Sequence, residues 1–178
     1  MAENKPNVKT RFVSWSEIQQ AIFTLGNRVV ESFKPDVIIA IAKGGLIPAR
    51  ILSDVLMMDE VGYIEVKFYK GVGVRSEKPF IKYLAIPPLK DKNVLIVDDV
   101  VDSGRTIQLV IDTLSVHAPR TMKTLVIYLK PWSTYIPDYY YEVTNEWIVF
   151  PWEICETIKE GVILDVREFQ ELGGKCVI

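Results

Sequence analysis

Histidine and cysteine are scarce in this chain of 178 residues, which has one histidine, His117, and two cysteines, Cys155 and Cys176. A Ser–His or Cys–His catalytic pair would have to use His117, which precedes Ala118-Pro119 at a predicted helix end, where a cation fits without catalysis. The cysteines have no metal-ligand spacing around them. Because disulfides are rare in the cytoplasm, we expect two reduced thiols and a cytoplasmic protein.

Long hydrophobic runs and an excess of one charge are also absent. No apolar stretch approaches the roughly 20 residues that span a bilayer, and the polar start of the chain, residues 1–6, does not resemble a signal peptide. The 21 basic and 23 acidic residues give a net charge of −2, which is not the footprint of a nucleic-acid-binding protein. We therefore expect neither a membrane nor a nucleic acid as a partner.

What remains is the composition of one globular domain, with 49% hydrophobic and 25% charged residues. Strand-like and helix-like apolar stretches alternate, which favours an α/β fold with a mainly parallel, twisted sheet flanked by helices. A capping box at Ser14–Glu17 predicts the start of the first helix. The further predicted helices are 46–57 and 106–116, and the predicted strands are 37–42, 63–69, 80–85, 94–97 and 124–129.

The composition changes after Lys130, where prolines, tryptophans and tyrosines gather. We predict a core of about residues 11–130 and a small C-terminal hood of about 131–160, joined by the N-terminal segment. The hood is expected to lie outside the regular sheet. Within it, we interpret Trp132 and the run Tyr139-Tyr140-Tyr141 as hood packing or a subunit contact. Residues 161–178 form a tail to which we assign no role.

The segment 94–106, VLIVDDVVDSGRT, carries the most chemical information. A buried strand ends in two carboxylates, Asp98 and Asp99, and a short loop from Asp102 leads into a helix. Backbone amides and hydroxyls at a helix N-terminus suit a phosphate, whereas the two acids suit sugar hydroxyls or a metal. The segment thus predicts a sugar phosphate ligand at the carboxyl edge of the sheet. The alternative is a solvated acidic turn, which the crowding of three acids in five residues disfavours.

This segment resembles the phosphoribosyl pyrophosphate signature of type I phosphoribosyltransferases: four apolar residues, two acids, two apolar residues, an acid, Ser or Thr, Gly, any residue and Thr. Further resemblances extend over about residues 11–155. IAIAKGGLIPA at 39–49 is similar to the family's pyrophosphate loop, and Phe68-Tyr69 before a loop at 70–79 is similar to its catalytic lid. Similarity to the base-recognition hood of bacterial xanthine-guanine enzymes and archaeal relatives rests on Lys130-Pro131, Trp147-Ile148 and Pro151-Trp152-Glu153.

The resemblance implies a type I phosphoribosyltransferase fold and an enzyme of purine salvage. It would transfer ribose 5-phosphate from phosphoribosyl pyrophosphate to a 6-oxopurine base (hypoxanthine, guanine or xanthine), giving a nucleoside monophosphate and pyrophosphate. Mg²⁺ is the implied cofactor, and we expect a homodimer or homotetramer. Two alternatives stay open: an adenine phosphoribosyltransferase, and a regulator that binds phosphoribosyl pyrophosphate or a nucleotide without turnover.

Within the signature, the resemblance implies that Asp98 and Asp99 hold the ribose hydroxyls, directly or through Mg²⁺. It makes Asp102 the candidate general base for the purine proton. The residues implied to cradle the 5-phosphate are Asp102, Ser103, Gly104, Arg105 and Thr106.

Outside the signature, the implied pyrophosphate site is Lys43, Gly44 and Gly45, with a cis peptide bond before Gly44. Tyr69 belongs to the lid, and Glu153, where some relatives have Asp, is a candidate metal partner through water. The implied base-binding residues are Lys130, Trp147 and Ile148. The Lys130 ammonium can donate to O6 of a 6-oxopurine but cannot accept from the amino group of adenine. The simpler alternatives are a plain Gly-Gly turn, a solvated hairpin loop at 70–79, a surface lysine at 130 and a core aromatic at 147.

Overall fold

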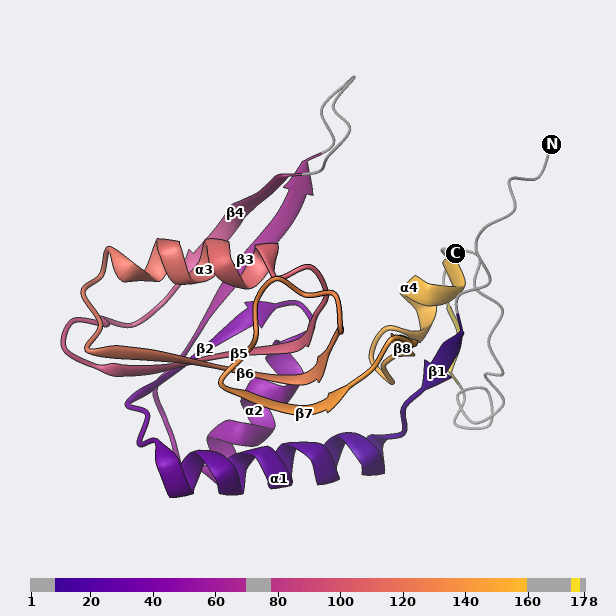
Figure 1. Ribbon diagram of the computed structural model, residues 1–178, viewed down its shortest axis with the longest axis horizontal. Helices are drawn as coiled ribbons and strands as arrows, with labels where there is room; N and C mark the ends of the chain where they lie inside the picture. Colours follow the sequence, from indigo (N-terminus) through magenta and orange to yellow (C-terminus); the bar gives the residue numbers. More distant parts are fainter. Residues whose placement is uncertain (1–8, 70–77, 160–173, 177–178) are drawn as a thin grey trace. The chain divides into compact units, whose positions relative to one another are not determined.

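The computed structural model describes residues 9–69, 78–159 and 174–176 (Figure 1). The chain divides into two compact units. The larger is Gln19–Asn145, and the smaller combines Met1–Ile18 with Glu146–Ile178. Among the described ranges, no helix is both long and apolar enough to cross a membrane.

The larger unit is built on a six-stranded sheet of order β4-β3-β2-β5-β6-β7, as far as the described residues show. All neighbouring strands run parallel except β4, which is antiparallel to β3. This arrangement confirms the mainly parallel α/β sheet expected from the sequence. The strands are β2 Val37–Ala42, β3 Val61–Tyr69, β4 Lys78–Ala85, β5 Asn93–Val101, β6 Thr121–Leu129 and β7 Tyr139–Val143.

Helices cover both faces of this sheet, so its central strands are buried on both sides. The helix α3, Arg105–Ser115, packs Ile107, Val110 and Leu114 into the main core. On the opposite face lie α2, Leu46–Val55, and the part of α1, Trp15–Ser32, that belongs to this unit (Figure 1). Burial on both faces explains why β2 reads as the continuous apolar run VIIAIA rather than as an alternating pattern.

The aromatic stretch after β6 differs from its prediction as irregular hood, because β7 adds a strand to the main sheet. Tyr139 is buried, and its hydroxyl lies 2.8 Å from Ser32 Oγ of α1. The Arg28 guanidinium donates to the Tyr140 carbonyl at 2.8 Å. These two tyrosines therefore attach the edge of the sheet to α1.

The smaller unit pairs two short parallel strands, β1 Thr10–Phe12 and β8 Trp147–Val149. The predicted capping box is confirmed, since Ser14 N donates to Glu17 Oε2 at 2.9 Å and Glu17 N donates to Ser14 Oγ at 3.2 Å. The short helix α4, Ile154–Lys159, carries Cys155, which forms a disulfide with Cys176. The expectation of two reduced thiols is therefore wrong for this structure.

Candidate active site

The two signature carboxylates lie inside β5 and not after it, because the ladder between β5 and β6 continues to the pair Val101–Leu129. Asp98 and Asp99 are 9% and 7% exposed. Backbone amides orient them: Asp99 N donates to Asp98 Oδ1 at 3.0 Å, and Val100 N donates to Asp99 Oδ1 at 2.7 Å. Their burial argues against a solvated acidic turn.

The charge of this carboxylate pair is poorly solvated. Burial raises the pKa of Asp98 well above its usual range, and the negative charge of Asp99 raises it further. Hydroxyl donors or a cation would relieve this repulsion. The arrangement suits a ligand that brings several hydroxyls or a divalent ion to the pair.

The loop between β2 and α2 lies directly against this pair. A Cβ atom at Gly44 would overlap the Asp99 carboxylate, so only glycine fits there. Gly45 is the N-cap of α2 and donates its backbone N–H to the Ile41 carbonyl at 2.9 Å. The cis peptide bond is Ala42–Lys43, one residue earlier than the bond expected before Gly44. The predicted pyrophosphate and ribose sites are therefore adjacent.

The predicted phosphate loop leads from β5 into the N-terminus of α3. Gly104 is the N-cap with φ of +85°, a left-handed conformation that favours glycine. Because Gly104 has no side chain, the N-cap residue itself forms no capping hydrogen bond. The Ser103 hydroxyl accepts from Arg105 N at 3.4 Å. An 11-residue helix whose N-cap residue is glycine can offer first-turn amides to an anion.

A second loop, residues 130–135 after β6, is attached to this phosphate loop. Lys130 N donates to the Val101 carbonyl at 2.9 Å, and the Thr134 hydroxyl donates to the Ser103 carbonyl at 2.9 Å. A Cβ on Gly104 would lie 2.7 Å from Tyr135 Cβ, so the two loops are in close contact. Because β5 and β6 are parallel neighbours, their carboxyl ends bring these loops to one edge of the sheet.

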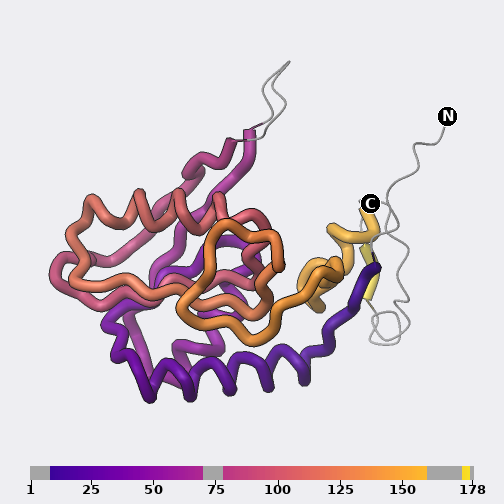
Figure 2. The backbone as a smooth tube through the Cα atoms, in the orientation of Figure 1, coloured from indigo at the N-terminus to yellow at the C-terminus, as the bar shows by residue number. Residues whose placement is uncertain are grey.

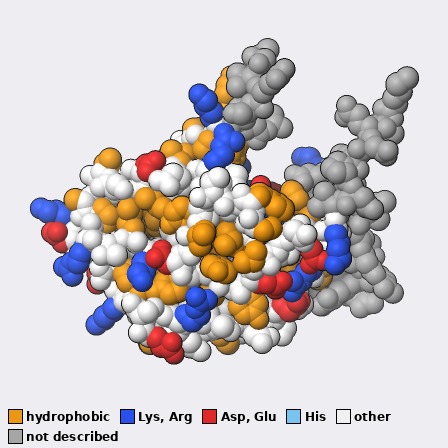
Figure 3. All heavy atoms as spheres, viewed as in Figure 1, with side chains coloured by type: hydrophobic (Ala, Val, Ile, Leu, Met, Phe, Trp, Pro, Cys, Tyr) orange, Lys and Arg blue, Asp and Glu red, His pale blue; other side chains and the backbone are white. Residues whose placement is uncertain are grey.

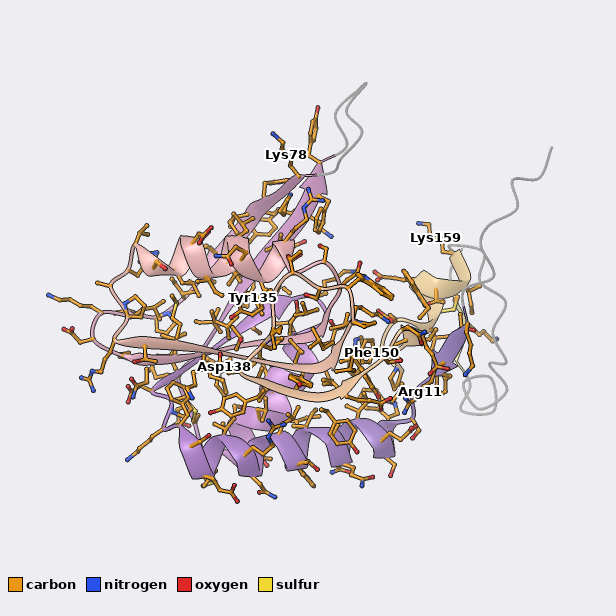
Figure 4. All side chains as sticks on the ribbon, in the orientation of Figure 1. Arg11, Lys78, Tyr135, Asp138, Phe150 and Lys159 are labelled. Atoms are coloured by element: carbon orange, nitrogen blue, oxygen red, sulfur yellow. A yellow bond between two sulfur atoms is a disulfide. The ribbon has the colours of Figure 1, made fainter. Side chains whose placement is uncertain are left out.

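The β6–β7 connection is anchored at its far end too, and its course can be followed in Figure 2. Thr124 N donates to Asp138 Oδ2 at 2.9 Å, and Thr124 Oγ1 lies 3.1 Å from the Tyr135 hydroxyl. Tyr135 and Asp138 are labelled in Figure 4. Burial raises the pKa of Tyr135. The connection is thus tied to β6 as well as to the phosphate loop.

Lys130 lies at the end of β6 and is 7% exposed, so the alternative of a surface lysine is excluded. Its Nζ lies 5.8 Å from the ring centroid of Trp132. The indole Nε1 of Trp132 in turn donates to Asp102 Oδ1 at 2.7 Å. The sequence interpretation of Trp132 as hood packing or a subunit contact missed this hydrogen bond, although a position two residues after a strand-end lysine indicated this edge of the sheet.

The remaining predicted site residues belong to elements other than the two loops described above. Tyr69 ends β3 and is exposed, and the rest of the predicted lid, residues 70–77, lies outside the described residues. Trp147, Ile148 and Glu153 belong to the smaller unit. Trp147 is half exposed, which excludes a core aromatic, whereas Ile148 is buried in β8.

The carboxylate of Glu153 accepts a hydrogen bond from Phe150 N at 3.1 Å. Within the described parts of the chain, no group of three or more histidine, cysteine or acidic residues could hold a metal ion. Glu153 as a metal partner therefore stays a prediction. The face drawn in Figure 3 shows basic and acidic side chains interspersed with hydrophobic ones, as the near-neutral composition leads one to expect.

Comparison with known proteins agrees with this architecture. A family model described as the phosphoribosyl transferase domain matches residues 14–158. The xanthine-guanine phosphoribosyltransferase of Cereibacter sphaeroides is 35% identical over 165 residues, covering 87% of this chain and 93% of that protein.

Two solved structures are also similar. The purine phosphoribosyltransferase of Pyrococcus horikoshii is 43% identical with a TM-score of 0.74, and the match covers 81% of this chain and 93% of that chain. A hypothetical protein from Neisseria gonorrhoeae with bound ppGpp is 25% identical with a TM-score of 0.77, and that match covers 94% of this chain and 97% of the other. The chain therefore belongs to the phosphoribosyl transferase family, among the purine enzymes of type I.

Proposed function

We propose that the protein transfers ribose 5-phosphate from phosphoribosyl pyrophosphate to a 6-oxopurine base and releases pyrophosphate. The single observation that carries the proposal is the contact between Gly44 and the buried Asp99 carboxylate of β5, the strand that precedes α3. An acid pair, a glycine loop and a helix N-terminus thus belong to the carboxyl ends of two neighbouring parallel strands, β2 and β5. The xanthine-guanine and purine phosphoribosyltransferases similar to this chain support the choice of base.

Each part of this edge meets one chemical need of the transfer. The amides at the start of α3 would hold the 5-phosphate, and Asp98 and Asp99 would fix the ribose hydroxyls. Lys43, Gly44 and Gly45 would contact the leaving pyrophosphate. Preorganised groups of this kind stabilise the charge that develops at the anomeric carbon and on the leaving group.

The purine is proposed to bind on the side of Asp102 and Lys130. Asp102 would accept the proton released from the ring nitrogen that attacks the ribose. The buried Lys130 ammonium would donate to O6, which favours a 6-oxopurine over adenine. The stacking of Trp147 on the base and the backbone contact of Ile148 stay predictions, as do a cytoplasmic location and a homo-oligomeric state.

The carboxylate pair also fits Mg²⁺. Burial, and then the repulsion between the two adjacent acids, raises the pKa of Asp98, and a divalent cation would stabilise the pair. Since Mg²⁺ usually keeps few protein ligands and takes the rest from phosphates and water, two acids are sufficient. Bound there, Mg²⁺ would supply positive charge toward the pyrophosphate and the ribose oxygens.

The proposal is tested by nucleotide formation from phosphoribosyl pyrophosphate and Mg²⁺, with hypoxanthine, guanine, xanthine and adenine assayed separately. Turnover with the 6-oxopurines is the expected result. Turnover with adenine alone would retain the reaction class and overturn the assignment of Lys130. Failure with every base would overturn the enzymatic proposal.

One observation favours a second candidate, a regulator that binds a nucleotide without turnover: the similar protein from Neisseria gonorrhoeae has bound ppGpp. Measurable binding of phosphoribosyl pyrophosphate or ppGpp, combined with no turnover of any base, would support this candidate. Competition between ppGpp and phosphoribosyl pyrophosphate in an active enzyme would instead place both ligands at one site.

A further inference from the structure

We propose that Trp132 is a positioning residue for Asp102: its indole N–H fixes one carboxylate oxygen so that the other faces the purine proton. The inference rests on the proposed function, because it gives Asp102 the role of general base. The hydrogen bond from Trp132 Nε1 to Asp102 Oδ1 is 2.7 Å long and joins residues 30 positions apart in the chain.

The chemistry of the two partners makes the bond directional. Indole has a single donor and no acceptor, and an ionised carboxylate only accepts. A donor bonded to a charged acceptor forms a short, strong hydrogen bond. Asp102 is exposed in the loop after β5, where a carboxylate without such a bond would sample several rotamers. With Oδ1 held by Trp132, Oδ2 remains to accept a proton from the base.

Backbone hydrogen bonds fix both ends of this contact. Trp132 lies in a turn closed by the bond from Ser133 N to the Lys130 carbonyl at 3.0 Å. The flanking residues Lys130 and Thr134 are bonded to Val101 and Ser103, the neighbours of Asp102. The indole and the carboxylate are therefore presented by two loops that are joined on either side of them.

Trp132 also touches the other residue assigned to the base. The Lys130 Nζ lies over its ring at 5.8 Å, within the range of a cation–π contact. One side chain thus contacts both the proposed proton acceptor and the proposed O6 donor. A shift of Trp132 would disturb both groups on the base side and leave the carboxylate pair of β5 untouched.

A purely structural role makes a different prediction. Trp132 is 56% exposed, so its burial adds little to the stability of the fold. If the indole hydrogen bond only held the loop in place, W132F would lower Tm and leave turnover unchanged. If it positions Asp102, W132F should lower turnover with little change in Tm.

The kinetic test compares the wild-type enzyme, W132F, D102N and the double variant. We expect W132F to lower kcat by ~10- to 100-fold, the scale of a displacement of about 1 Å at a reacting group, while the KM for phosphoribosyl pyrophosphate changes little. In the D102N background W132F should have no further effect on kcat, because the proton acceptor that the indole positions is gone and phenylalanine keeps an aromatic ring beside Lys130. The matched control is F23L, since Phe23 is 44% exposed on α1, which contributes no residue to the proposed site; its kcat should equal the wild-type value.

A second measurement does not depend on turnover. Indole N–H signals of the full-length protein are recorded by ¹H–¹⁵N NMR, and W132F identifies the Trp132 signal by its disappearance. In D102A this signal should move upfield, toward that of an indole bonded only to water. An unmoved signal would overturn the hydrogen bond and the inference together.

The kinetic outcomes separate this inference from the function on which it rests. A wild-type enzyme that is inactive with every base overturns the proposed function, and the positioning role with it. Normal wild-type turnover with an unchanged kcat in W132F overturns the positioning role alone. Equal losses from W132F in the wild-type and D102N backgrounds would also overturn it, because the indole would then act independently of Asp102.

Discussion

Replacing Gly44 by alanine should damage the site far more than the fold. The added Cβ would overlap the Asp99 carboxylate and lie 2.7 Å even from its farther oxygen, Oδ1. Carbon atoms in contact normally keep about 3.5–4.0 Å from their neighbours. The carboxylate would therefore have to move by about 1 Å or more.

That movement breaks the 2.7 Å hydrogen bond from Val100 N to Asp99 Oδ1. A bond to a charged group contributes about 1.5–3 kcal/mol, and forcing an extra methyl group into a packed site costs about 1–3 kcal/mol. A loss near 2 kcal/mol would lower Tm by roughly 4–8 °C in a domain of this size. Because Asp99 is proposed to hold the ribose, kcat/KM for phosphoribosyl pyrophosphate should fall by ~10²-fold or more.

The assay is nucleotide formation at varied phosphoribosyl pyrophosphate, with thermal unfolding measured in parallel. Gly26→Ala is the matched control, because its Cβ would lie 2.8 Å from Val55 Cγ1, where α1 packs on α2. It should lower Tm without changing kcat/KM. A G44A enzyme with unchanged kcat/KM for phosphoribosyl pyrophosphate would refute the assignment of the β2–α2 loop to this substrate.

Three further predictions follow from the buried groups and the disulfide. Because the pKa of Asp98 is raised in the folded protein, folding stability falls as pH rises above the unfolded pKa of about 3.9. D98N should therefore raise the Tm of the ligand-free protein at pH 7, and this difference should vanish near pH 4. Equal gains in Tm at both pH values would contradict the raised pKa. K130A should lower kcat/KM for the 6-oxopurine by ~10- to 100-fold, the effect of losing a charged hydrogen bond, and an equal loss for phosphoribosyl pyrophosphate would indicate a fold defect instead. Thiol titration of the unreduced, denatured protein should find no free cysteine, and two titratable thiols would contradict the disulfide. Reduction of Cys155–Cys176, which lie 21 positions apart in the chain, should lower the free energy of unfolding by up to about 3 kcal/mol.

Local sequence patterns predicted the elements that local interactions form. The capping box at Ser14–Glu17 places the start of α1 because its hydrogen bonds span three residues. The apolar run at Val37–Ala42 predicted β2 with its observed bounds, because a strand buried on both faces needs apolar residues throughout. The signature at 94–106 likewise placed the carboxylates and the helix start at one edge of the sheet.

Features that depend on distant partners could not be predicted in this way. β7 joins the sheet because Tyr139 and Tyr140 find partners on β6 and α1, contacts that aromatic composition does not encode. β5 continues through Asp98 and Asp99 because β6 supplies a ladder alongside, although aspartate disfavours strands. The hydrogen bond between Trp132 and Asp102 forms only because the ends of β5 and β6 lie side by side. The disulfide was not predicted, because cysteines in cytoplasmic proteins are usually reduced.

The attachment of residues 130–135 to the phosphate loop limits how this enzyme can change its substrate. Lys130 and Thr134 form hydrogen bonds with Val101 and Ser103, so the loop proposed to recognise the base and the loop proposed to bind the phosphate cannot move independently. If these assignments hold, backbone changes in the first loop that favour a new base would also alter sugar-phosphate affinity through the second. Evolution toward another purine is therefore easier through the tips of side chains than through insertions or deletions in the loop backbone.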